Sequence, residues 1–290
     1  IAQGPLLRAV RWTGPMREVK STGNLRESHE KIENPDKPLF EEGVSMRFVL
    51  AAIGFVNEDT EHNKKRIIDS MAKYAGRADM LIFGEAFLQG FYGVNFEPDH
   101  DRDIAVEKDS ALISDICFAA KKNSIGVSFG FIETEEGFFY SSQMTIDKMG
   151  NVIDMYRRVS PGWKEKTAGD LYREGQNFHS FKFLGKRIAV ALCGDLWYEE
   201  NVQEIKELKP DIVWWPVYTD YIFQDWNTSI KFAYADQAAK VGRPVLYVNS
   251  VCLDKADEQE IAKGGASHFE NKRIILETPA GLESELLVEL

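Results

Sequence analysis

The sequence has few cysteines and few histidines. Its three cysteines, Cys117, Cys193 and Cys252, are widely spaced and form no CxxC pair. Neither a disulfide framework nor a structural zinc site is therefore expected, and a reducing, cytoplasmic location fits best. The five histidines never stand at the spacing of metal ligands. We expect no metal and no cofactor.

An excess of positive charge and a long apolar run are also missing. The formal net charge is −11, whereas proteins that bind phosphate backbones or anionic lipids need clustered lysine and arginine. No run of about 18 apolar residues is present to span a bilayer. We therefore expect no nucleic-acid partner and no membrane. With 290 residues, of which 44% are hydrophobic, the chain can bury one large core.

Composition divides the chain near residue 45. Residues 1–45 carry glycine, proline and many charges, and no apolar period of 2 or 3.6 persists there. We expect a flexible or loosely docked extension; an ordered subdomain is the alternative. From Met46 onward strands and helices alternate without an internal repeat, so residues 46–290 are predicted to form one domain.

Periodicity assigns the elements of this domain. Apolar stripes predict helices at 63–77, 110–123, 201–208 and 226–241. Short apolar runs predict strands at 47–54, 80–83, 125–132, 142–146, 152–156, 181–183, 187–192, 211–216 and 244–249, and a last strand pair at 273–276 and 286–290. Hairpins mixed with crossover helices favour an α/β sandwich with partly antiparallel sheets.

Cys193 is the strongest candidate for a reactive side chain. It ends the apolar strand IAVALC and is followed at once by Gly194 and Asp195, which must turn the chain. Strand ends of this kind expose reactive groups in α/β folds, and the turn aims the backbone N–H of Gly194 toward an oxyanion formed beside the sulfur. The alternative is that Cys193 is a small buried apolar residue.

Glu85 is the second candidate, at the end of the apolar strand MLIFGE. A carboxylate between apolar segments is partly desolvated, which makes it a credible proton acceptor. A strand-end glutamate that reaches solvent is the alternative.

Six motifs in order resemble the nitrilase, or carbon–nitrogen hydrolase, superfamily. They are the strand and LIFGE segment ending at Glu85, the GNVIDMYRR segment, the strand ending in CGD, the PDIVWWP strand, the helix from Trp226 leading to PVLYVN, and GGAS. The resemblance implies a four-layer α-β-β-α sandwich and a Glu–Lys–Cys triad. In such a triad the glutamate takes the thiol proton, the cysteine attacks the carbon and the lysine stabilises the oxyanion, which divides hydrolysis into acylation and deacylation. Glu85 and Cys193 are expected about 3–4 Å apart.

The cation departs from the superfamily pattern, because Arg158 stands where the resemblance implies lysine. Arginine keeps the charge, but its fork is larger and it does not release a proton. If Arg158 is the working cation, Arg158→Lys is expected to preserve or raise activity. Lys164 and Lys166 are alternative cations, or solvated loop charges.

Two further features are carried over from the resemblance. A second acid precedes the nucleophile in many members; here Asp170 lies nearest, with Glu165 and Glu174 as rivals, and proline before the base is replaced by Gly84. The substrate pocket is expected to be apolar and confined. Its candidate residues are Phe87, Trp163, Trp197 and Tyr218, and packing in the core or at a dimer interface is the alternative for each of them.

The favoured function is hydrolysis of a carbon–nitrogen bond in a small amide, carbamoyl compound or nitrile through a cysteine thioester. The alternatives are a catalytically impaired binding or regulatory protein on the same fold, and an amide-forming acyltransferase. The resemblance also implies a homodimer or a higher homo-oligomer.

Overall fold

The computed structural model describes residues 45–255 and 257–290. The predicted extension at residues 1–45 lies outside the described residues, apart from Ser45. Two six-stranded sheets make up the centre of the described chain. A two-stranded sheet of β2 (Gly54–Phe55) and β11 (Val251–Cys252) lies beside them. No helix in the described ranges is both long and apolar enough to cross a membrane.

The first sheet has the strand order β14-β1-β3-β4-β5-β6. Its strands are β1 (Arg47–Ala52), β3 (Met80–Phe83), β4 (Gly126–Glu135), β5 (Phe138–Ile146), β6 (Val152–Arg157) and β14 (Ser284–Glu289). β1, β3 and β4 run parallel, whereas β5, β6 and β14 are added antiparallel. The carboxyl ends of the parallel strands therefore meet at one edge, where ligands bind in open α/β sheets.

The second sheet has the order β13-β12-β10-β9-β8-β7. Its strands are β7 (Ser180–Phe183), β8 (Lys186–Val190), β9 (Ile212–Val217), β10 (Val245–Asn249), β12 (Ala266–Glu270) and β13 (Arg273–Thr278). Here too the three central strands, β8, β9 and β10, are parallel and their outer neighbours are antiparallel.

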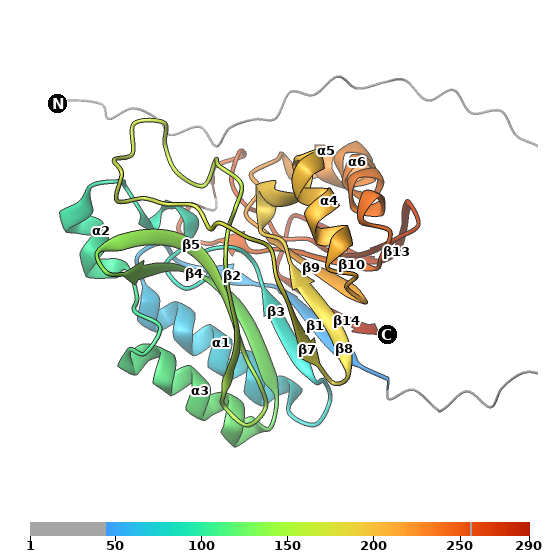
Figure 1. The fold of residues 1–290 in the computed structure, drawn as a ribbon, viewed down its shortest axis with the longest axis horizontal. Coiled ribbons are helices and arrows are strands. Elements are labelled where there is room, and N and C mark those ends of the chain that lie inside the picture. The colour runs from blue at the N-terminus through green and yellow to red at the C-terminus, as the bar shows by residue number, and fades with distance from the viewer. Residues whose placement is uncertain (1–44, 256) are drawn as a thin grey trace, which may run out of the picture. The chain divides into compact units, whose positions relative to one another are not determined.

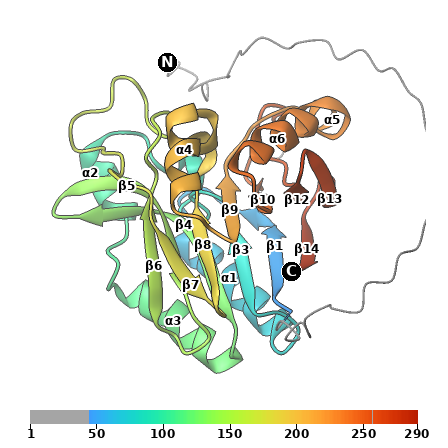
Figure 2. The ribbon, with the colours of Figure 1, turned by 45° about the vertical axis from the view of Figure 1, so that its right-hand side comes forward.

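Helices cover the outer faces of both sheets (Figures 1 and 2). The α-helices are α1 (Thr60–Tyr74), α2 (Pro98–Ile104), α3 (Ala111–Asn123), α4 (Glu199–Glu207), α5 (Phe223–Asp225) and α6 (Lys231–Ala238). Single turns of 3₁₀-helix are η1 (Phe91–Gly93), η2 (Cys193–Trp197) and η4 (Ala239–Val241), and η3 (Trp226–Ile230) is a π-helical turn. Side-chain caps begin two of the helices: Asp59 accepts from His62 N at 2.9 Å, and Ser110 accepts from Ile113 N at 3.3 Å.

Side-chain alternation along the strands builds the layers. In β1, Phe48 packs in the core that the two sheets share, whereas Val49 packs under α1 and α3. In β9, Trp214 meets Phe48 with ring centroids 5.9 Å apart, whereas Trp215 stacks on Tyr234 of α6 at 5.1 Å. Since successive strand residues face opposite sides, this alternation produces the predicted α-β-β-α sandwich.

The structure corrects three details of the predicted elements. The last two strands do not pair with each other: β13 pairs with β12 in the second sheet, and β14 pairs with β1 in the first. The helix predicted at 226–241 is a π-helical turn followed by α6 and a 3₁₀ turn. The short α2 and β12 were not predicted, because neither shows a sustained apolar period.

Candidate active site

Glu85 lies just beyond β3, where the two sheets approach each other. Its backbone N–H donates to Val217 O, at the end of β9, at 3.2 Å. A Cβ on Gly84 would lie 2.6 Å from Ser250 Oγ and 2.8 Å from Val217 O. Glycine before the glutamate therefore permits the close approach that carries Glu85 into the interior.

Cys193 follows β8 in a strained turn. Its φ of +40° lies in the left-handed region, which residues with a side chain rarely adopt and which recurs at functional sites. The Trp215 indole donates to Cys193 O at 2.8 Å, and the thiol donates to Tyr218 O at 3.3 Å. Both contacts come from β9 and the loop after it, so the neighbouring strand holds the turn in place.

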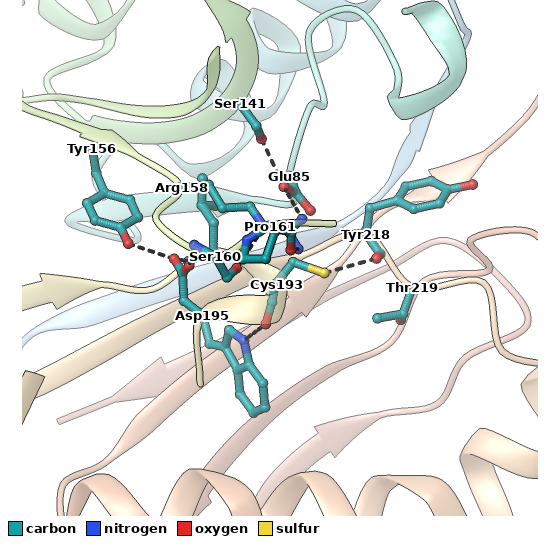
Figure 3. A network of polar contacts seen from close by, with 12 residues as sticks. Glu85, Ser141, Tyr156, Arg158, Ser160, Pro161, Cys193, Asp195, Tyr218 and Thr219 are labelled. Atoms are coloured by element: carbon teal, nitrogen blue, oxygen red, sulfur yellow. Dashed lines mark hydrogen bonds and ion pairs between the residues drawn. The ribbon is translucent and has the colours of Figure 1, made fainter. Parts of the chain in front are cut away.

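A buried ion pair stands beside this turn (Figure 3). Arg158 follows β6, and its Nη1 lies 2.9 Å from Glu85 Oε1, with side-chain exposures of 4% and 0%. Ser141 Oγ donates to the same carboxylate oxygen at 2.8 Å. Glu85 Oε2 is buried and has no hydrogen-bond partner among the described residues. Figure 3 shows this second oxygen on the side of the Cys193 sulfur.

Asp195 connects the turn at Cys193 to the loop that follows Arg158. Its Oδ2 accepts from Tyr156 OH at 2.6 Å and from Leu192 N at 2.7 Å, and its Oδ1 accepts from Ser160 N at 2.7 Å. Ser160 Oγ in turn accepts from Arg158 Nε at 3.0 Å. One buried carboxylate therefore fixes both sides of the site, and its burial raises the pKa of Asp195.

Burial keeps the resting thiol of Cys193 protonated, and the two neighbouring charges act in opposite directions. Burial raises the pKa of Cys193 to about 12, the negative charge of Glu85 adds to the shift, and Arg158 opposes it. Burial by itself would lower the pKa of Arg158, but the negative charge of Glu85 and its hydrogen bond to the guanidinium hold it above its ordinary value. A neutral thiol beside a carboxylate needs that carboxylate to remove its proton before it can attack.

The structure brings together four of the residues singled out from the sequence: Cys193, Gly194, Glu85 and Arg158. The alternative cations and acids pair with other residues or are exposed. Lys164 is paired with Glu174 at 2.9 Å and Glu165 accepts from Thr167 at 2.9 Å, while Lys166 and Asp170 are exposed. In the described part of the chain, no ion pair joins these alternative residues to Glu85.

The four predicted pocket residues divide into two pairs. Phe87 is fully buried in the apolar core under α1 and α3, with its ring centroid 4.8 Å from Phe83. Trp163 is buried against Tyr172. Trp197 and Tyr218 lie nearer the cysteine. Trp197 packs against Trp215, and the carbonyl of Tyr218 accepts from the thiol.

Sequence reasoning missed four supporting residues: Ser141, Tyr156, Ser160 and Asp195. The available signal was polarity inside apolar surroundings, since Ser141 stands in the buried strand FFYSSQMTI. Asp195 was recognised as part of the turn but not as the acceptor that organises it. Nowhere in the described ranges do three or more His, Cys, Asp or Glu side chains gather in a way that could hold a metal ion.

The chain is similar in sequence to an amidase and to a cyanide hydratase. An (R)-stereoselective amidase from Pseudomonas sp. is 24% identical over 58% of this chain and 58% of its own length. A cyanide hydratase from Microdochium sorghi is 27% identical over 73% of this chain and 58% of its own length. This chain therefore spans about 58% of the length of these curated relatives.

Solved structures share the fold. A nitrilase-superfamily amidase from Nesterenkonia AN1 superposes with a TM-score of 0.69 at 18% identity, covering 87% of this chain and 93% of the amidase. A glutamine-dependent NAD⁺ synthetase from Acinetobacter baumannii gives a TM-score of 0.68 at 20% identity, over 84% of this chain and 45% of the synthetase. The sequence pattern of the carbon-nitrogen hydrolase family matches residues 48–279. The chain belongs to the carbon-nitrogen hydrolase family.

Proposed function

We propose that the chain hydrolyses the carbon–nitrogen bond of a small non-peptide amide through a thioester on Cys193. The observation that carries the proposal is the unequal use of the Glu85 carboxylate. Oε1 is held by Arg158 and Ser141, whereas Oε2 is buried without a partner among the described residues. A buried acceptor left open beside a protonated thiol is the arrangement that general-base activation requires.

The proposed reaction has two halves. Glu85 Oε2 takes the thiol proton as the sulfur attacks the amide carbon, and the backbone N–H of Gly194 and the guanidinium of Arg158 face the developing oxyanion. When the carbon–nitrogen bond breaks, the proton passes from Glu85 to the leaving amine. Water then attacks the thioester, Glu85 takes a proton from it, and the thiol is restored when the carbon–sulfur bond breaks.

The surroundings of Cys193 support a small acyl group. Trp215 and Tyr234 are stacked at 5.1 Å, and Trp215 contacts the cysteine carbonyl. Cys193 packs against the buried cluster that contains Trp215, Tyr234 and Tyr247. Bulky aromatic rings packed close to the sulfur leave little room for a peptide chain, which favours a short linear amide.

Ammonia or amine release from a panel of short aliphatic amides and the matching nitriles tests the proposal. We expect turnover of at least one amide by the wild type, none by Cys193→Ala, and turnover slowed by about 10²–10⁴-fold in Glu85→Gln. Cys117→Ala is the matched control, because this half-buried cysteine lies on α3, and it should keep wild-type rates. Turnover that survives Cys193→Ala would refute the proposal.

Two other outcomes would favour the alternatives. Arg158 already donates to three acceptors in the protein, which is compatible with a structural role for its charge. If the protein binds amides without cleaving them, it is a binding or regulatory protein. Faster thioester breakdown when an amine is added, with amide formed in place of the free acid, would indicate an acyltransferase.

A further inference from the structure

The residue after the nucleophile is glycine for reasons of space. The φ of Gly194 is not in the left-handed region, so its backbone conformation is open to any residue. A Cβ built there would lie 2.5 Å from Arg158 Nη2 and 2.9 Å from Ser160 Oγ. The guanidinium of Arg158 therefore occupies the space that a side chain at position 194 would need.

The three guanidinium nitrogens each have their own acceptor. Nη1 donates to Glu85 Oε1 at 2.9 Å, Nε to Ser160 Oγ at 3.0 Å, and Nη2 to Pro161 O at 3.1 Å. Ser160 is itself fixed, since its N–H donates to Asp195 at 2.7 Å. The acceptors thus surround a planar fork, whereas a lysine ammonium concentrates its donors at one point.

We propose that Gly194 and Ser160 are positioning residues that commit this site to arginine as its cation. Gly194 provides the space for the fork, and Ser160 orients it through Nε. This inference rests on the proposed hydrolase function. It reverses the expectation drawn from sequence for Arg158→Lys: a lysine would leave acceptors around the fork unpartnered and the space beside Gly194 unfilled, so activity should fall.

A double-mutant cycle tests the coupling. The proteins are wild type, Gly194→Ala, Arg158→Lys and the double variant, compared by burst-phase acylation with one activated ester. Gly194→Ala should slow acylation about a hundredfold with little change in KM, because it displaces the cation by about 1 Å. Arg158→Lys should slow it at least tenfold. In the lysine background the added alanine should cost less than about twofold, because the contact with Arg158 Nη2 at 2.5 Å is removed. The contact with Ser160 Oγ at 2.9 Å remains, but once Nε no longer binds this hydroxyl it can rotate away.

Gly169→Ala is the matched control. A Cβ on Gly169 meets nothing within 4 Å and its φ is not positive, so this variant should acylate like wild type. Ser160→Ala should slow acylation, and Ser160→Thr, which keeps the hydroxyl, should recover most of the rate. The inference is overturned if Gly194→Ala acylates like wild type, or if alanine costs the same factor in the arginine and lysine backgrounds.

Thermal unfolding separates this inference from the proposed function. Gly194→Ala should lower the Tm by several degrees in the arginine background and by less than about 1 °C in the lysine background. If none of the tested substrates acylates the wild type but the Tm values show this coupling, the hydrolase proposal fails. The inference that Gly194 and Ser160 position Arg158 then still holds. If Gly194→Ala lowers the Tm equally in both backgrounds, the inference that Gly194 provides the space for the Arg158 guanidinium is overturned, whatever the activity.

Discussion

Replacing Glu85 by glutamine should destabilise the protein by leaving a charge buried alone. Glu85 and Arg158 lie 2.9 Å apart with almost no exposure. At an effective dielectric constant of about 20, two unit charges at that distance attract by roughly 6 kcal/mol. Part of this attraction offsets desolvation, and removing one partner of a buried pair typically costs about 3–5 kcal/mol. The Tm of Glu85→Gln should therefore fall by roughly 6–20 °C.

The double variant Glu85→Gln/Arg158→Met should regain much of this loss, because an uncharged pair carries no desolvation cost. Asp69→Asn is the control: it breaks the exposed Lys65–Asp69 pair, and the Tm should move by no more than about 2 °C. Differential scanning calorimetry at pH 7.5 measures all three. A Glu85→Gln Tm equal to wild type, or losses that simply add in the double variant, would refute the buried-pair argument.

The remaining predictions concern the buried Tyr172–Asp101 hydrogen bond, the thiol of Cys193 and the oligomeric state. Tyr172 donates to the fully buried Asp101 at 2.6 Å, so Tyr172→Phe should cost about 1.5–3 kcal/mol in urea unfolding, while the exposed Tyr198→Phe should cost almost nothing; equal effects would contradict this reading. Burial raises the pKa of Cys193 to about 12, so the rate of its alkylation by iodoacetamide should still increase between about pH 7 and pH 10. Peptide mass spectrometry measures this rate, and a plateau near pH 8 would indicate an ion-paired thiolate instead. Light scattering should report a dimer with twice the mass of the 33.0 kDa chain. Phe232 on α6 is 56% exposed, so Phe232→Asp should weaken the dimer if this side chain lies in the interface. A monomeric wild type at micromolar concentration would count against the predicted dimer.

The sandwich was predictable because its signal is local. Runs such as IVWWPV are buried along their whole length, and the 3.6-residue stripe of α1 faces one sheet. The pairing of the last strands was not predictable in the same way. β13 and β14 are neighbours in sequence but join different sheets, a choice made by the packing of distant strands and not by the hairpin signal between them.

Strand ends and a family resemblance selected Glu85, Cys193 and Arg158 as candidate site residues, and the structure places these three together. The residues that support them were not predictable. The role of Asp195 depends on three donors from separate segments, and no periodicity encodes such contacts. The pocket residues were hard to select for a related reason, since an aromatic residue near such a segment gives the same sequence pattern whether it lines a pocket or fills the core.

The central claim is that Cys193 is a nucleophile activated by Glu85. Intact-mass spectrometry after a brief exposure to a small activated amide tests it most directly, with peptide mapping to locate the adduct. The account predicts one acyl group per chain on Cys193 in the wild type, no adduct in Cys193→Ala, and acylation slowed by about 10²–10⁴-fold in Glu85→Gln. An acyl group found on Cys117 or Cys252, or equal acylation rates in wild type and Glu85→Gln, would contradict it.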